Sequence, residues 1–82
     1  MRLPIVSGRK LLRFVRKLNY EIIRWRGSHV RRRKITMLGE HSITVPYHDE
    51  IAKGTLSSII SSLSKWNNIP KDELIEMLRR DC

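Results

Sequence analysis

The sequence predicts an α+β fold, in which a helix, a three-stranded antiparallel sheet, a second helix and a short third helix form one domain over residues 1–82. Three observations predict it. Apolar residues recur at helical spacing near the N-terminus and again in the second half of the chain. Between these regions lie three short segments rich in strand-forming residues, and turn signals separate them. Strands joined by tight turns pair antiparallel, and the helices then cover one face of the sheet.

The first helix is expected over about residues 8–18. Ser7 precedes it and offers a side-chain oxygen to the first free backbone amides. Asn19 is a plausible end, because asparagine tolerates the left-handed backbone that often follows a helix. The apolar residues at helical spacing are Leu11, Leu12, Val15 and Leu18.

The first strand is expected over residues 20–26, which are rich in β-branched and aromatic residues. Its register is ambiguous, because Tyr20 with Ile22 and Ile23 with Trp25 give two competing inner faces. The pair Gly27-Ser28 then marks a turn.

The second strand is expected from Val30 to Met37 and carries so many cations that both of its faces cannot be buried. Residues 38–41 supply the next turn, with His41 expected as an exposed turn residue. A short third strand over residues 42–45 ends at Pro46, which cannot donate a hydrogen bond to a sheet.

The second half of the chain predicts two helices. One has an apolar stripe opposite a serine-rich face, so it buries one side, and the break at Asn67-Asn68 ends it. Gly54-Thr55 at its start is expected to cap it, with a phosphate contact as the second possibility. The third helix opens at Pro70, where acidic residues complement the free amides. The expected core residues of the two helices are Leu56, Ile59, Ile60, Leu63, Leu74, Ile75 and Leu78.

The charge of the chain narrows the classes of partner. Lysine and arginine outnumber aspartate and glutamate 17 to 8, which gives a net charge of +9. An electrostatic field of this sign favours nucleic acid, an anionic membrane surface or an acidic protein as the partner.

No apolar run approaches the ~20 residues that cross a bilayer, so we expect no membrane insertion and a cytoplasmic protein. The single cysteine, Cys82, permits neither an intramolecular disulfide nor a cysteine metal cluster and is expected to be an exposed bystander thiol.

His29 lies in the predicted turn itself and has cations on both flanks. Imidazole exchanges protons near neutral pH, so it can act as a general base toward a ribose 2'-hydroxyl without a metal or other cofactor. Arg24, Arg26 and Arg31 lie on two strands that meet at this turn, where they are placed to stabilise a phosphorane. On the residues alone, the simpler interpretation is a turn histidine bonded to backbone, with the cations forming a solvated face.

A resemblance to a known family favours the catalytic interpretation. The order of elements resembles the double-stranded RNA-binding domain architecture, and five local features in sequence together resemble the HicA family of toxin mRNA interferases. These features are Leu3-Pro4 with Ser7-Gly8, the strand from Tyr20 with Arg24 and Arg26, Gly27-Ser28-His29-Val30, Val45-Pro46-Tyr47-His48, and Lys53-Gly54-Thr55-Leu56.

The resemblance implies an endoribonuclease that cleaves mRNA and is neutralised by a HicB-type antitoxin protein. It maps the catalytic histidine of the family onto His29. We expect RNA contacts from a set of cations and polar residues around it: Arg24, Arg26, Ser28, Arg31, Arg33, Lys34, His48 and Lys53.

Two other classes of protein fit the same charge. One is a non-catalytic RNA-binding module with the same fold, and the other is an interaction module whose basic surface binds an acidic protein. The segment Gly27-Ser28-His29 favours the nuclease, because neither alternative requires a histidine at the end of a cationic hairpin.

The remaining histidines and the tryptophans have less specific roles. His48 either faces the turn that carries His29 or caps its own loop. The three histidines lie in separate predicted turns without ligand spacing, so no zinc site is expected. Trp25 and Trp66 are expected in core or partner contacts, with stacking of a splayed base on Trp25 as the alternative.

Overall fold

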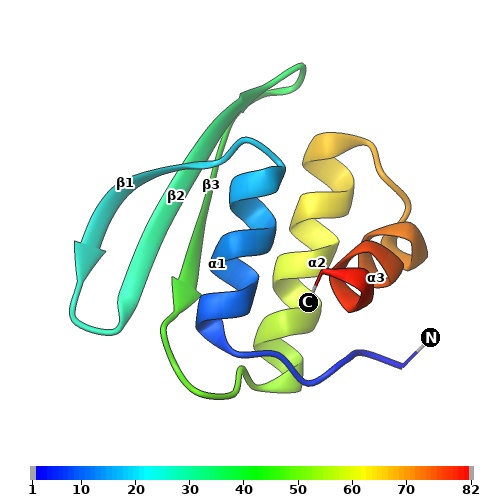
Figure 1. Cartoon of the computed structure of the whole chain (residues 1–82). Helices are drawn as coiled ribbons and strands as arrows, with labels where there is room; N and C mark the ends of the chain where they lie inside the picture. The colour runs from blue at the N-terminus through cyan, green and yellow to red at the C-terminus, as the bar shows by residue number, and fades with distance from the viewer. Residues whose placement is uncertain (1, 82) are drawn as a thin grey trace.

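The structure, a computed structural model, describes residues 2–81 and confirms the predicted α+β order. Figure 1 shows the helices on one side of a three-stranded sheet, with α3 beyond α2. Cys82 lies outside the described residues. The elements are α1 (Gly8–Lys17), β1 (Glu21–Arg26), β2 (His29–Thr36), β3 (Gly39–Pro46), α2 (Lys53–Asn67) and α3 (Lys71–Arg80).

The sheet has the order β1-β2-β3, and both pairs of neighbours are antiparallel. Along β2, Val30 and Arg32 are buried against the helices, whereas His29, Arg31 and Arg33 are exposed. Alternate residues of a strand point to opposite faces. The second group therefore lies on the open face of the sheet, which the helices do not cover.

A β-bulge resolves the ambiguous register of β1. The pairing shifts between Ile22, which lies opposite Arg32, and Arg24, which lies opposite Arg31. The extra residue, Ile23, lets Ile22 and Trp25 share the helix-facing side although they are three positions apart. Neither simple alternation described this strand, because a bulge breaks the period of two.

The core lies between the sheet and the helices, and the predicted helical stripes form it. Asn19 adopts the left-handed φ of 73° after α1, and Asn68 adopts one of 53° after α2, which confirms both expected helix ends. Strand β1 lies at the edge, and all six of its residues are exposed. The largest fully buried side chains are Tyr20, Phe14, Leu11, Leu56, Ile60, Leu63, Leu74, Leu78, Val15, Val30 and Val45.

The start of α2 differs from the prediction. Ala52 occupies the N-cap position and makes no side-chain capping bond, so the expected cap at Gly54-Thr55 was wrong. The helix already begins at Lys53, which makes Thr55 its third residue, whereas a capping side chain precedes the helix. At α1, by contrast, the Ser7 side chain accepts a bond of 3.0 Å from the amide of Lys10, as predicted.

The N-terminus of α1 is fixed against the segment that follows β3. The amide of Gly8 donates to the carbonyl of His48 at 2.8 Å, and a Cβ at Gly8 would collide with the carbonyl oxygen of Pro46. The amide of Tyr47 in turn donates to the carbonyl of Ser28 at 2.6 Å. These bonds gather the start of α1, the β1–β2 turn and the β3–α2 loop at one end of the sheet, which we call the turn end.

Candidate functional site

The β1–β2 hairpin places His29 among arginines. Gly27 has a φ of 56°, a left-handed conformation that glycine adopts without strain, so the strand reverses at residues 27–28. His29 is the first residue of β2 rather than a member of the turn, and it lies opposite Arg26 of β1 and Pro46 of β3. Arg24 lies opposite Arg31, one step along the same face.

This open face carries positive charge with little compensation. Within residues 2–81, Arg24, Arg26 and Arg31 form no ion pair, and the His29 ring has no hydrogen-bond partner. Arg33 lies further along the face and approaches the Glu40 carboxylate at 3.4 Å, with both groups exposed. The unpaired guanidinium groups can bind the phosphates of a polyanion. The exposed imidazole beside them then remains accessible to the bound polyanion and can act as a base.

Three other residues of the predicted RNA-contacting set also lie near the turn end. Ser28 is in the β1–β2 turn and is half-buried, with its carbonyl bonded to Tyr47. His48 is exposed in the β3–α2 loop, beside the N-terminus of α1. Lys53 is the exposed first residue of α2.

Lys34 is separated from this group. It faces the helices, where its ammonium donates to the Asn67 Oδ1 atom at 2.5 Å and lies 5.6 Å from the centre of the Tyr20 ring. The odd-numbered positions of β2 point to the open face, so an even-numbered residue does not join them. This placement favours a structural role for Lys34.

The structure corrects the prediction for His41, which is buried rather than exposed in a turn. Strand β3 begins at Gly39, so His41 is its third residue and faces the helices. Its Nδ1 atom lies 2.7 Å from the Tyr20 hydroxyl, and its ring stacks on Trp66 with centroids 5.0 Å apart. Asn67 donates to the same hydroxyl at 2.9 Å, which leaves the hydroxyl hydrogen available for His41.

Burial determines the protonation of this cluster. It lowers the pKa of His41, because the charged imidazolium would lose its hydration. It also raises the pKa of Tyr20, although the bond from Asn67 acts in the opposite direction. Both groups are therefore neutral near pH 7, and His41 belongs to the packing of the fold rather than to the exposed site.

A buried cation, Arg32, lies on the helix-facing side of the sheet. Arg32 is 8% exposed and donates to the carbonyl of Tyr20 at 2.8 Å. Burial and, to a smaller extent, the charge of Arg16 lower the pKa of Arg32. The Arg32 Nε atom is buried without a partner in the described part of the chain.

The tryptophans occupy different environments. Trp66 stacks on His41 at the junction of α2 and the sheet, which is the packing role that the sequence predicted for it. Trp25 is 53% exposed and contacts Tyr47. It is thus a surface residue at the turn end rather than a part of the core.

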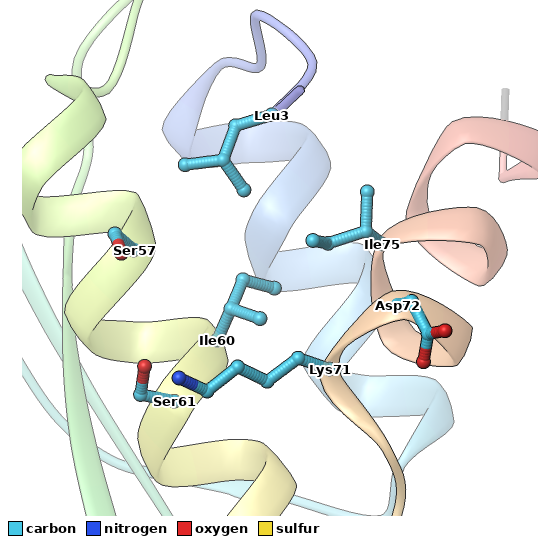
Figure 2. A pocket seen from close by; sticks show the side chains of 7 residues that line it. All are labelled: Leu3, Ser57, Ile60, Ser61, Lys71, Asp72 and Ile75. Atoms are coloured by element: carbon cyan, nitrogen blue, oxygen red, sulfur yellow. The ribbon is translucent and has the colours of Figure 1, made fainter. Parts of the chain in front are cut away.

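The cavities among the helices do not contain the predicted site. Figure 2 shows one of about 440 Å³, bounded by Leu3 and by side chains of α2 and α3, in which Lys71 extends toward Ser61. None of the predicted RNA-contacting residues lines it.

Across residues 2–81, no group of three or more His, Cys, Asp or Glu side chains is arranged to hold a metal ion. Within the same range, no helix is long and apolar enough to cross a membrane.

A small layered α+β domain with a cationic hairpin and an exposed histidine has the charge and the accessible surface to bind a polyanion. Residues 8–64 match the HicA toxin family of bacterial toxin–antitoxin systems. This match covers more than half of the 82 residues, and the chain belongs to the HicA toxin family. No curated protein and no solved structure matches the chain.

Family membership establishes the general activity. HicA toxins are mRNA interferases, ribonucleases that form one half of a toxin–antitoxin pair, so RNA is the substrate and an antitoxin is the partner. The matched segment includes the whole sheet and both of its turns, together with α1 and most of α2. It therefore contains His29 and the arginines of the open face.

Proposed function

We propose that this chain cleaves mRNA as a metal-independent endoribonuclease in which His29 is the general base. The observation that carries the proposal is the hairpin register, which sets an exposed imidazole beside Arg24, Arg26 and Arg31 on an uncovered sheet face. Within the described residues these arginines have no carboxylate partner, so their charge remains available to a phosphodiester.

The reaction requires two functions from these residues. The His29 imidazole takes the proton from a ribose 2'-hydroxyl, and that oxygen forms a bond to the adjacent phosphorus. The arginines stabilise the charge of the phosphorane, the bond from phosphorus to the 5'-oxygen then breaks, and the departing oxygen takes a proton from water while the His29 imidazolium returns its proton to solvent. The products are a 2',3'-cyclic phosphate and a 5'-hydroxyl, and no step draws on a metal ion.

The test is cleavage of a short end-labelled RNA by the purified chain in excess chelator. The expected products carry the two ends named above, and a single 2'-deoxyribose at the cleaved position should abolish cleavage there without weakening binding. A His29→Ala protein purified in parallel is the control for contaminating nuclease. Binding without any cleavage would instead support the RNA-binding module, which has the same charged face but no chemistry.

The antitoxin is proposed to be a HicB-type protein that covers the open face with acidic and apolar groups. Charge complementarity to the unpaired arginines supports this, since a net charge of +9 attracts an acidic partner. Co-expression with such an antitoxin should restore host growth, and the purified complex should not cleave RNA. A complex that cleaves as fast as the free toxin would show that the antitoxin binds elsewhere.

A further inference from the structure

Two exposed aromatic side chains form a pair at the turn end. The centroids of the Trp25 and Tyr47 rings lie 5.2 Å apart, with their planes inclined by 58°. Trp25 is 53% exposed and Tyr47 is 41% exposed, whereas Phe14 and Tyr20 are fully buried. The pair therefore presents aromatic surface to solvent.

Hydrogen bonds hold both residues against the β1–β2 turn. The indole N–H of Trp25 donates to the carbonyl of Gly27 at 3.1 Å, and the backbone amide of Tyr47 donates to the carbonyl of Ser28 at 2.6 Å. His29 follows these two turn residues directly. The aromatic pair and the proposed general base are thus positioned by the same short segment, so the rings need little reordering to accept a ligand.

Trp25 and His29 lie on opposite faces of the sheet, near its β1 edge. Trp25 lies opposite Val30 and shares its helix-facing side, whereas Arg26 lies opposite His29 on the open face. Strand β1 is one of the two edge strands, and every residue in it is exposed. A single-stranded chain whose scissile phosphate is at His29 can pass around this edge and bring a neighbouring base onto Trp25.

The charges near the pair favour nucleic acid over a protein as the occupant. Arg24 and Arg26 precede and follow Trp25 in β1, and their side chains point to the opposite, open face, where His29 lies. Further along the helix-facing side, a cavity of about 490 Å³ is lined by Arg16 and Arg32 together with Glu21. In the described part of the chain neither arginine has an ion pair. Exposed aromatic rings with cations on the backbone's path to either side are typical of sites that bind single-stranded nucleic acid.

We propose that Trp25 and Tyr47 form a stacking site for a base of single-stranded RNA next to the cleaved phosphodiester bond. This inference rests on the proposed function, because it places the base relative to His29. Stacking accepts every base, so the site anchors unpaired RNA without reading its sequence. It also discriminates against duplex RNA, in which the faces of the bases are already stacked on their neighbours.

A fluorescence experiment tests the contact directly. In a Trp66→Phe variant, Trp25 is the single tryptophan of the chain, and phenylalanine can still stack on His41. The ligand is a 2'-O-methyl oligonucleotide of about ten nucleotides, which lacks the attacking hydroxyl, and its binding is followed separately by anisotropy of a terminal dye. The expected result is quenching of the Trp25 emission that saturates with the anisotropy signal, with much weaker quenching by a duplex of equal length.

A cycle of substitutions locates the stacked base. Trp25→Ala should weaken binding of the single strand by roughly 5- to 150-fold, and Trp25→Phe by much less. A thermal melt of each variant checks that it folds. The effect of Trp25→Ala should disappear when one abasic nucleotide replaces the base beside the cleaved bond, but not when it replaces a distant base.

The outcomes separate this inference from the proposed function. RNA that binds to Trp25→Ala and to the unaltered chain equally well, without quenching Trp25, would overturn the stacking site and leave the nuclease intact. Failure of the unaltered chain both to bind and to cleave RNA would overturn the proposed function itself. A Trp25→Ala variant that binds RNA normally but loses its antitoxin would show that the pair is a protein-docking surface, and the inference would be wrong.

Discussion

The two ends of the sheet carry histidines in opposite environments. At the turn end, His29 is exposed on the open face. Its ring has no hydrogen-bond partner within residues 2–81. At the end where β3 begins, His41 is 7% exposed, bonded to Tyr20 and stacked on Trp66.

The different environments of His29 and His41 predict different roles, one in a reaction and one in packing. A general base needs an imidazole that substrate can reach, and a ring that is already bonded and stacked is not free to move a proton to or from RNA. The His41 ring instead joins the sheet to the C-terminal end of α2 through Tyr20 and Asn67. Under the proposed function, His29 serves chemistry while His41 serves stability, so variants of each should affect one property and spare the other.

The largest expected effect is on cleavage by His29→Ala. Loss of a general base lowers the cleavage rate by roughly 10²- to 10⁴-fold, while the unfolding free energy changes by less than about 0.5 kcal/mol because the ring is exposed. Single-turnover cleavage of a labelled RNA gives the rate, and urea unfolding gives the stability. Cleavage at the unaltered rate in nuclease-free preparations would remove the catalytic assignment.

Much of the fold and the placement of the arginines around His29 could be predicted from the sequence, but the burial of His41 could not. The helical stripes of α1 and α2, both helix ends at asparagine and the antiparallel order of the strands followed from periodicity and turn chemistry. The hairpin that joins residues 24–31 likewise predicted that Arg24, Arg26 and Arg31 would gather near His29, and the structure places them on one face.

The errors have identifiable causes. A bulge at Ile23 hid the register of β1, because a bulge leaves no period in so short a segment. His41 was assigned to a turn because histidine beside Gly39-Glu40 suggests one, yet His41, Ile43 and Val45 alternate along β3 and all three are buried. The partners of His41 could not be inferred, since Tyr20 and Trp66 come from distant parts of the chain.

His41→Ala should have the second largest effect, on stability alone. It leaves a cavity beside Trp66 and removes one partner of the buried Tyr20 hydroxyl, at a cost of about 2 to 4 kcal/mol in the unfolding free energy. Urea unfolding measures the loss, and the cleavage rate of the folded protein should stay within about twofold. A large loss of activity in a still folded His41→Ala protein would contradict the separation of roles.

The pH dependence of stability should also distinguish the two histidines. Because burial lowers the pKa of His41, the unfolded chain binds more protons than the folded one below about pH 6.5. The unfolding free energy should therefore fall as the pH is lowered from 7 toward 5.

The matched variants are His41→Asn and His29→Asn. Asparagine at position 41 cannot take up a proton but can offer an amide near the position of Nδ1, so its stability should depend less on pH than that of the unaltered chain. His29→Asn should keep the original dependence. Equal pH profiles for the unaltered chain and His41→Asn would show that another group causes the loss.

The smallest expected effects come from two cations of β2 that point to opposite faces of the sheet. Arg31 points to the open face without an ion partner among the described residues, whereas Lys34 faces the helices and donates to Asn67. Arg31→Ala should weaken RNA binding by about 3- to 10-fold at moderate salt and reduce the slope of log K against log salt by about 0.7, the value for one phosphate contact on a single strand. Lys34→Ala should leave that slope unchanged and lower the unfolding free energy by about 1 kcal/mol, because it removes a half-buried hydrogen bond. Titrations of dye-labelled 2'-O-methyl RNA at several salt concentrations measure both slopes, and an equal reduction for the two variants would mean that RNA reaches the helix-facing side of β2 as well as the open face.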